Sequence, residues 1–478
     1  MHFDIDSVFC YNNTWQVLLV MMRVFFKNKF NILILFLFAV IAVAGILHHE
    51  IWRDEGQVWL VVRDLNLYGV FDHVRNEGHP LLWYLLVMPF AKLKLPVISM
   101  QFLSFAFMTA AAGVFLWFSP FSKVSKVCVI FSAGFLYWLT IISRSYSIIP
   151  LFLFLAAVFY SKQKEHPYWY CVFNILLSNT HILMFGFCSA IAMLFGYENI
   201  FKNPENRKKY ITPFIITLVC LAVTALYILT RPEENESASV APLSTINLAD
   251  VWSSISGFFV NIYAEYSLNA IIGGICILAA MLWLFVRDKK LGFVFCFSSF
   301  YQFYIYVCVW KSSPEKAMLV LLSLVFCLWC VLISRTFTTR EKVFVNLLVI
   351  LIFGLTLRLG YQLYRYDILY KYSGSKEAAG FIQNNIEKDA VIISNITLTT
   401  AGLLAYLPDR QFYVTVFNDY YTFGYKKFSM KKERNFDGRK VYYIYSAMAK
   451  PDKNKEILFV SASDTLIPTE VFYIARDK

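Results

Sequence analysis

The stretch Phe30–His48, FNILILFLFAVIAVAGILH, decides the fold class because it is an apolar run without a single Asp, Glu, Lys or Arg. A helix of about 20 such residues crosses the hydrocarbon core of a bilayer. The rest of the chain has the same character: 58% of the 478 residues are hydrophobic, 16% are charged, and the mean hydropathy is +0.55. Soluble domains contain roughly 25% charged residues. The sequence therefore predicts a membrane protein with many spans.

Further apolar runs follow this first span, and together they predict about eleven membrane helices. The stretch Trp15–Met22 is too short to cross and is expected to lie on the membrane surface, within a cytoplasmic N-terminal segment 1–29. The segment 30–360 is expected to form the transmembrane domain. The predicted spans are 30–48, 97–118, 127–143, 146–160, 168–181, 183–197, 211–230, 267–286, 291–309, 317–333 and 343–360.

The distribution of charge predicts how these spans are oriented. Alternate loops, such as those around 202–209 and 287–290, carry nearly twice as many Lys and Arg residues as the loops between them. Cytoplasmic loops retain positive charge, so we expect the N-terminus in the cytoplasm and the C-terminus outside a plasma (inner) membrane. The net charge of +12 is spread over short loops and forms no basic groove with interleaved aromatic residues. Nucleic acid is therefore not an expected partner.

The composition becomes more polar after Gly360, and segment 361–478 is expected to fold in water outside the membrane. Ser375 can cap a helix that runs to about Asn385, and a second helix is expected before Pro408. Short apolar runs predict strands between and after these helices. The expected order is helix 375–385, strand 390–394, helix 397–407 and strands 412–416, 441–446, 457–461 and 471–475, which suggests a small α/β domain.

The long outer loop 48–96 contains the most unusual residues. Asp54 and Glu55 open a stretch in which Val58, Val61, Val62 and Leu65 recur at helical spacing, so a helix is expected to lie in the membrane interface. Such a carboxylate pair could do chemistry at the membrane surface. It could equally be two first-turn residues that complement the helix dipole.

A second acidic site lies later in the same loop, in the run Asn76-Glu77-Gly78-His79-Pro80. Pro80 suits the first position of a second interfacial helix. Glu77 and His79 then precede that helix, where His79 could be either a functional or a capping residue.

Three outer turns add polar residues on the same side of the membrane. Arg144 lies between two predicted spans, where an arginine is costly without an anionic partner, so it predicts a nearby carboxylate or phosphate. His181 and Lys316 lie in two other outer turns. Taken alone, a lysine in a turn is more often a solvated residue than a ligand. A histidine at such a position is more often a residue at a helix end than a functional one.

Together these residues resemble the integral-membrane glycosyltransferases of the GT-C class, which take a sugar from a polyprenyl-phosphate carrier. The sequence is similar to bacterial lipopolysaccharide-core galacturonosyltransferase-like proteins and, more distantly, to protein O-mannosyltransferases and the aminoarabinose transferase of lipid A. The tail 375–408 resembles the exported domain of these families. The resemblance is carried by Asp54-Glu55, the run Glu77-Gly78-His79-Pro80-Leu81-Leu82-Trp83-Tyr84, Arg144-Ser145-Tyr146 and Thr180-His181, in this order.

The resemblance implies an α-helical multi-pass membrane protein of GT-C type with a small C-terminal α/β extracytoplasmic domain. It implies inverting transfer of a sugar from a polyprenyl-phosphate donor to a glycolipid, polysaccharide or protein acceptor. Asp54 would be the base that removes the proton of the acceptor hydroxyl, with Glu77 as a second catalytic residue. Arg144 would bind the donor phosphate, supported by His181 and Lys316. The other candidates for substrate binding are Glu55, His79 and Tyr146.

The resemblance leaves the metal question open. Glu55 would either support the loop or join Asp54 in a divalent metal site, and two adjacent carboxylates without further ligands do not decide between these roles.

Three other functions compete with this interpretation. A transporter or lipid flippase would place ionisable residues near the bilayer midplane, often in two related halves, whereas here they lie at outer turns and no repeat is evident. A polysaccharide polymerase or O-antigen ligase usually has a large late outer loop, but here the long loop comes first. In a noncatalytic scaffold, the acidic loop would tolerate neutral substitutions.

Overall fold

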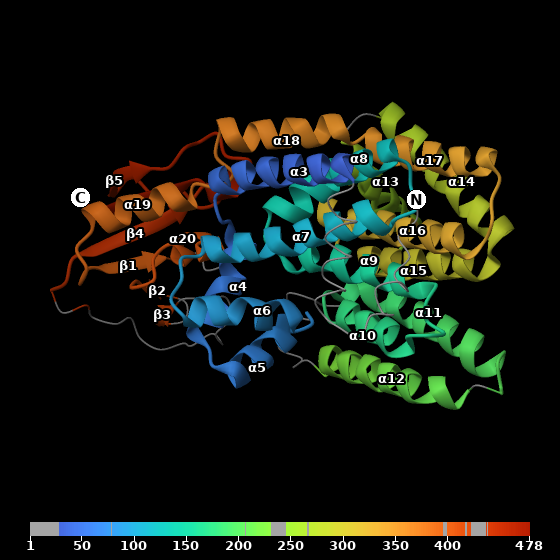
Figure 1. The fold of residues 1–478 in the computed structure, drawn as a ribbon. Coiled ribbons are helices and arrows are strands. Elements are labelled where there is room, and N and C mark those ends of the chain that lie inside the picture. The colour runs from blue at the N-terminus through green and yellow to red at the C-terminus, as the bar shows by residue number, and fades with distance from the viewer. Residues whose placement is uncertain are drawn as a thin grey trace.

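The computed structural model describes residues 28–77, 79–205, 207–230, 245–264, 267–394, 399–415, 418–421, 436 and 438–478. The stretch Trp15–Met22, which is expected to lie on the membrane surface, is outside these residues. The described chain forms a long helical bundle with a small sheet domain at one end (Figure 1). The chain is thus a multi-pass helical membrane protein with a C-terminal sheet domain, as the sequence predicts.

Within the described residues, eight helical segments are long and apolar enough to cross a membrane. A ninth is formed if the helices α8 and η1, which are bent by 42° relative to each other, count as one span. The eight segments are α3 (Lys29–His48), α7 (Ile98–Phe118), Ile182–Phe201 (η3 Ile182–Met184, α11 Phe185–Gly196 and η4 Tyr197–Phe201), α12 (Lys208–Leu229), α14 (Ser267–Arg287), α15 (Lys289–Cys308), α16 (Pro314–Ser334) and Thr339–Leu369 (α17 Thr339–Gly354 and α18 Leu357–Leu369); the bent pair is α8 (Lys123–Ile130) and η1 (Ala133–Ile141).

Two predicted spans are helical but shorter than the others. They are Ser145–Tyr160, made of η2 (Ser145–Ile148) and α9 (Ile149–Tyr160), and α10 (Pro167–Ser178). Each predicted apolar run is therefore helical, whereas the total of about eleven crossings stays a prediction.

One helix in the bundle was not expected from the sequence. The helix α13 (Leu248–Tyr263) is amphipathic and packs against α14, α15 and α16. The hydroxyl of Tyr263 donates to the carbonyl of Ile352 over 3.2 Å. Polar residues interrupt the apolar character of this segment, so a search for uninterrupted apolar runs overlooks it.

The charges at the two ends of the bundle belong to different sets of loops. At the end predicted to be cytoplasmic, Arg335 Nη2 lies 2.9 Å from Asp288 Oδ2, and Lys290 pairs with Glu198. At the opposite end, Arg144 pairs with Asp54. This separation agrees with the predicted alternation of the loops, and the absolute orientation in the membrane stays a prediction.

The outer loop folds into three helices, α4 (Arg53–Asp64), α5 (Leu67–Glu77) and α6 (Leu82–Lys92). Glu55 to Val62 of α4 are all buried, so this helix has no open polar face, and its predicted level in the membrane interface stays a prediction. Leu60 belongs to the hydrophobic core of the C-terminal sheet domain, so α4 is enclosed between that domain and the bundle. The amphipathic pattern of a helix identifies its apolar face, but it does not show which part of the protein packs against the opposite, polar face.

The C-terminal domain, called the exported domain here because the sequence predicts its export, contains a six-stranded sheet with the order β3-β2-β1-β4-β6-β5. Strand β1 runs parallel to β2 and β4, and the other neighbouring strands are antiparallel. The strand β3 was not expected, and helix α18 runs across the predicted boundary at Gly360 as far as Leu369. The elements are α19 (Ser375–Asn385), β1 (Val391–Ser394), α20 (Ala401–Ala405), β2 (Phe412–Val414), β3 (Asp419–Tyr421), β4 (Val441–Ser446), β5 (Lys455–Val460), η7 (Pro468–Glu470) and β6 (Phe472–Asp477).

The exported domain contacts the outer loop almost backbone to backbone. A Cβ atom at Gly56 in α4 would lie 2.4 Å from the carbonyl oxygen of Ala401 in α20. A Cβ atom at Gly402 would lie 2.8 Å from the carbonyl oxygen of Ile51. Only glycine permits this approach, and it places the domain directly behind the residues that follow the first span.

Candidate active site

A cavity of about 260 Å³ lies where the outer loop meets the outer ends of the bundle helices. Seven of the eight residues singled out from the sequence line this cavity, although they come from five separate stretches of the chain. The lining residues are Asp54, Gln57, Val58, Glu77, His79, Tyr84, Arg144, Tyr146, His181, Trp310 and Lys316.

Arg144 has the anionic partner that its position between two spans predicts. Its Nη1 atom lies 2.9 Å from Oδ2 of Asp54 and 3.8 Å from Oε1 of Glu315. Burial lowers the pKa of Arg144, but Asp54 and the other neighbouring groups, among them Glu315, together outweigh this effect and raise it above its ordinary value. The guanidinium also lies over the rings of Trp52 and Tyr146, at 5.9 and 5.4 Å from their centroids. Arg144 is therefore a fixed positive charge at the cavity wall.

Glu77 is surrounded by hydrogen-bond donors. Gln57 Nε2 donates to its Oε1 atom over 3.0 Å, His73 Nε2 lies 3.2 Å from the same oxygen, and the hydroxyl of Tyr84 donates to Oε2. Burial raises the pKa of Glu77, but the hydrogen bond and charge of His73, with those of its other neighbours, lower it to about 2. Glu77 is thus an ionised carboxylate whose lone pairs are largely occupied.

Two histidines from distant parts of the chain meet in the cavity. The ring of His181 stacks on Tyr146 at 4.5 Å and lies 5.2 Å from the ring of His79, which stacks on Trp310 at 5.6 Å. Burial, together with nearby positive charge, lowers the pKa of His79 to about 4 and that of His181 well below its ordinary value. Both rings are therefore neutral at neutral pH, so His181 does not add the positive charge expected of it.

Each of these rings presents a buried nitrogen without a hydrogen-bond partner among the described residues, Nδ1 of His79 and Nε2 of His181. The Nδ1 atom of His181 accepts from the amide of Leu183 over 3.2 Å. In a neutral imidazole the other nitrogen then carries the proton. The Nε2–H group of His181 can therefore donate to a ligand oxygen in the cavity.

Lys316 is the second cationic group in the lining. It lies in the first turn of α16, with Nζ 5.8 Å from the centroid of the Trp310 ring, and it donates to the carbonyl of Lys311 over 3.3 Å. This hydrogen bond holds the ammonium group at the edge of the cavity, on a different element from Arg144.

Four lining residues were not predicted from the sequence. Gln57 and Val58 follow Asp54 by three and four positions, so helical spacing alone places them on its face of α4. Tyr84 was part of the quoted run but received no role, although it is the donor to Glu77. Trp310 carried only a weak signal, as an aromatic residue beside the outer turn that contains Lys316.

Glu55 lies behind the cavity and does not line it. Its carboxylate is fully buried and contacts His49 and Ser143, whereas that of Asp54 faces Arg144. The two carboxylates therefore point to different partners and do not form a shared pair of metal ligands. Among the described residues, no group of three or more His, Cys, Asp or Glu side chains is placed to hold a metal ion.

A solved structure shares this architecture. It is the crystal structure of ArnT from Cupriavidus metallidurans bound to undecaprenyl phosphate, which matches with a TM-score of 0.54 over 94% of this chain and 98% of that chain, at 9% sequence identity. No known protein family and no curated protein matches the sequence. The protein therefore has an ArnT-like membrane fold of the GT-C type with a small C-terminal sheet domain.

Proposed function

We propose that the protein is an inverting glycosyltransferase that moves a sugar from a polyprenyl-phosphate donor to a hydroxyl of a glycolipid, polysaccharide or protein, on the outer face of the plasma (inner) membrane. The observation that carries this proposal is the convergence of two carboxylates, two cationic side chains and two unpartnered imidazole nitrogens in one cavity at the end of the bundle. The ArnT-like fold supports it, since ArnT was solved with undecaprenyl phosphate.

Arg144 and Lys316 are the proposed ligands of the donor phosphate. When the bond between sugar and phosphate breaks, negative charge develops on the leaving phosphate, and fixed cations in a site with little water stabilise it. The Nε2–H group of His181 can add a hydrogen bond without adding charge. Tyr146 stacks against both Arg144 and His181 and holds their planes in place.

Asp54 is the proposed base. In a single displacement, the acceptor oxygen attacks the anomeric carbon as its proton passes to the base, and the bond from that carbon to the phosphate oxygen breaks with inversion. Glu77 lines the same cavity, but a carboxylate with a pKa of about 2 is a weak base at neutral pH. We therefore assign Glu77, with His79, to orienting the sugar or the acceptor.

The transporter or flippase interpretation remains as the competing outcome of the test. Transporters place their substrate site near the middle of the membrane. Here the cavity is built from the outer loop and from helix ends beside the exported domain, and that location favours chemistry at the membrane surface.

The test is transfer of labelled sugar in membranes that contain matched amounts of wild type, Asp54→Asn or Arg144→Ala, supplied with a panel of polyprenyl-phosphate sugars and with lipid, polysaccharide and protein acceptors. Asp64→Asn is a matched control, because Asp64 lies at the other end of α4 and pairs with Arg63. We expect transfer by wild type and the control, and a loss of about 100-fold or more in Asp54→Asn. No transfer from any donor in a complete panel would favour the transporter function.

A further inference from the structure

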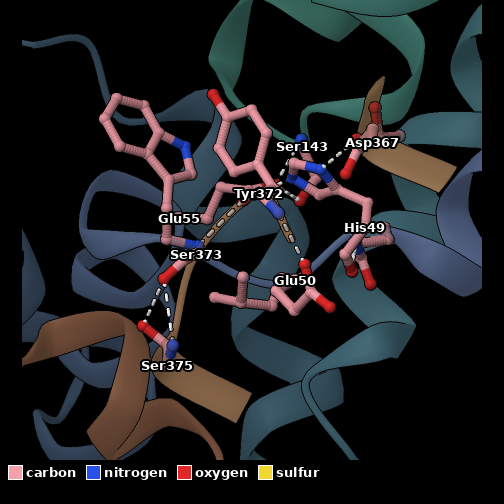
Figure 2. A network of polar contacts seen from close by, with 12 residues as sticks. His49, Glu50, Glu55, Ser143, Asp367, Tyr372, Ser373 and Ser375 are labelled. Atoms are coloured by element: carbon pink, nitrogen blue, oxygen red, sulfur yellow. Dashed lines mark hydrogen bonds and ion pairs between the residues drawn. The ribbon is translucent and has the colours of Figure 1, made fainter. Parts of the chain in front are cut away.

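A buried network of polar contacts joins His49, Glu55 and Asp367 (Figure 2), and Glu55 is the neighbour of the cavity residue Asp54 in the chain. At its centre, His49 follows the first span and is only 3% exposed. Its Nδ1 atom lies 2.8 Å from Oδ2 of Asp367 in α18, and its Nε2 atom lies 3.1 Å from Oε2 of Glu55 in α4. One imidazole therefore joins two elements that are more than 300 residues apart in the chain.

The charge state of His49 suits this bridging position. Burial lowers the pKa of His49, but Asp367 and Glu55 outweigh this effect and raise it to about 10. The ring is therefore an imidazolium that donates from both nitrogens. The hydroxyl of Tyr137 donates to the same oxygen of Asp367 over 3.1 Å, so the far end of the bridge is also fixed.

Glu55 uses its second oxygen to hold the turn that carries Arg144. Both the amide and the hydroxyl of Ser143 donate to Oε1 of Glu55, each over 2.6 Å. Two successive residues of α4, Asp54 and Glu55, therefore bind two successive residues of this turn, Arg144 and Ser143. This double contact fixes the position of the proposed base, Asp54, relative to the proposed phosphate ligand, Arg144.

The exported domain holds the same run of chain from its other side. The buried carboxylate of Glu470 accepts from the amide of Arg53, the residue before Asp54, over 3.1 Å. Its other oxygen accepts from the hydroxyl of Ser373 over 2.6 Å. The start of α4 is thus fixed by α18 through His49 and by the exported domain through Glu470.

We infer that His49, Asp367 and Glu55 form a positioning bridge that fixes Asp54 against Arg144, and that α18 and the exported domain are thereby part of the catalytic centre. This inference rests on the proposed function. Buried ion pairs add little net stability compared with apolar packing, but they can specify one geometry. A change of about 1 Å at reacting groups can lower a rate by about 100-fold, so such a bridge has a catalytic effect although it touches no substrate.

The network also contains a matched control. Glu50 is as buried as Glu55 and is five residues away, but it accepts from the amide of Tyr372 over 2.8 Å and pairs with Lys371 at 3.3 Å. This branch makes no hydrogen bond or ion pair with Glu55, Asp54 or Arg144. It touches the bridge only through the ring of Tyr372, which packs on His49 and Trp52. Glu50→Gln therefore reports any general effect of removing a buried carboxylate here, and Glu55→Gln reports the bridge.

The experiment measures hydrogen exchange in the purified full-length protein, and transfer kinetics, for wild type, Glu55→Gln and Glu50→Gln. We expect Glu55→Gln to increase exchange by about tenfold or more in the peptides around 52–58 and 141–147 and to lower kcat by about tenfold or more with little change in the acceptor KM. Glu50→Gln should leave exchange in both peptides and kcat within about twofold of wild type. Ser143→Ala, which removes one of two hydrogen bonds and no charge, replaces Glu55→Gln if that variant does not fold.

The bridge is ruled out if Glu55→Gln, or Ser143→Ala in its place, leaves exchange unchanged in these peptides, or if Glu50→Gln produces equal changes. A further check compares His49→Gln, Asp367→Asn and the double variant. The loss of kcat in the double variant should be smaller than the product of the two single losses, because both residues act through Glu55. Should wild type transfer no sugar while Glu55→Gln still increases exchange at 141–147, the positioning of Arg144 stands and the proposed function fails.

Discussion

The guanidinium of Arg144 lies 2.9 Å from the carboxylate of Asp54, so the proposed phosphate ligand and the proposed base are paired with each other. A donor phosphate that binds Arg144 has to compete with this carboxylate. Binding of the donor would thus break the ion pair between Asp54 and Arg144, and Asp54 would keep only the longer contact of 3.7 Å with Arg53 while it accepts a proton. The arrangement links recognition of the leaving group to activation of the base.

This competition predicts opposite effects of one substitution on binding and on transfer. Asp54→Asn removes the carboxylate that competes for Arg144, so its affinity for undecaprenyl phosphate should rise by about two- to tenfold while transfer is lost. Binding to the protein in detergent, measured by calorimetry, checks the first part. Weaker binding by Asp54→Asn would show that Asp54 helps to hold the phosphate, and Asp64→Asn should bind as wild type does.

Glu77→Gln should have a different kinetic effect from Asp54→Asn. Because Gln57 and Tyr84 donate to Glu77 and its pKa is about 2, its carboxylate orients neighbours and is not expected to accept the reacting proton. We expect a higher KM with a decrease in kcat of about tenfold or less, measured by steady-state transfer. A decrease in kcat as large as that of Asp54→Asn would instead make Glu77 the base.

Glu470 predicts a pH dependence of stability at the junction with the exported domain. Burial raises its pKa from 4.5 to about 7. Between these values the folded protein keeps a proton that the unfolded chain has released, so stability falls as pH rises through this window, by up to about 3 kcal/mol. Melting temperatures from pH 4.5 to 7.5 should fall in wild type and stay more nearly level in Glu470→Gln. Equal slopes for the two proteins would contradict the raised pKa.

Contact between α4 and α20 predicts that Gly56 tolerates no side chain. In Gly56→Ala, the new methyl group would lie 2.4 Å from a backbone carbonyl oxygen, so α4 and α20 must separate. We expect a loss of about 1–3 kcal/mol in stability and a marked loss of transfer. Gly380→Ala in α19 is the control, since a methyl group there meets nothing within 4 Å. Thermal unfolding and limited proteolysis of the exported domain measure the effect, and equal stability of the two variants would contradict it.

Most of the architecture was evident from the sequence because its causes are local. Apolar runs such as Phe30–His48 have to be helical in a bilayer, where every backbone group must be satisfied within the segment. The helix Ser375–Asn385 and the strand Val441–Ser446 depend on neighbouring residues and were predicted with the observed bounds. The predicted cap is wrong, because Ser375 is the first helical residue and Gly374 occupies the cap position without a side-chain hydrogen bond. Helix α13 and strand β3 were missed because their apolar patterns are short or interrupted.

The sequence by itself also determined which polar residues to examine, since Asp54, Glu77, His79, Arg144 and the others stand out at outer turns of an apolar chain. Only the tertiary structure decided their roles. It paired Asp54 with Arg144, surrounded Glu77 with donors and turned Glu55 away to Ser143 and His49. Asp367 and Glu470, hundreds of residues away, carried no signal in the sequence. Long-range contacts and burial set the protonation and direction of each side chain, and neither can be read from sequence spacing.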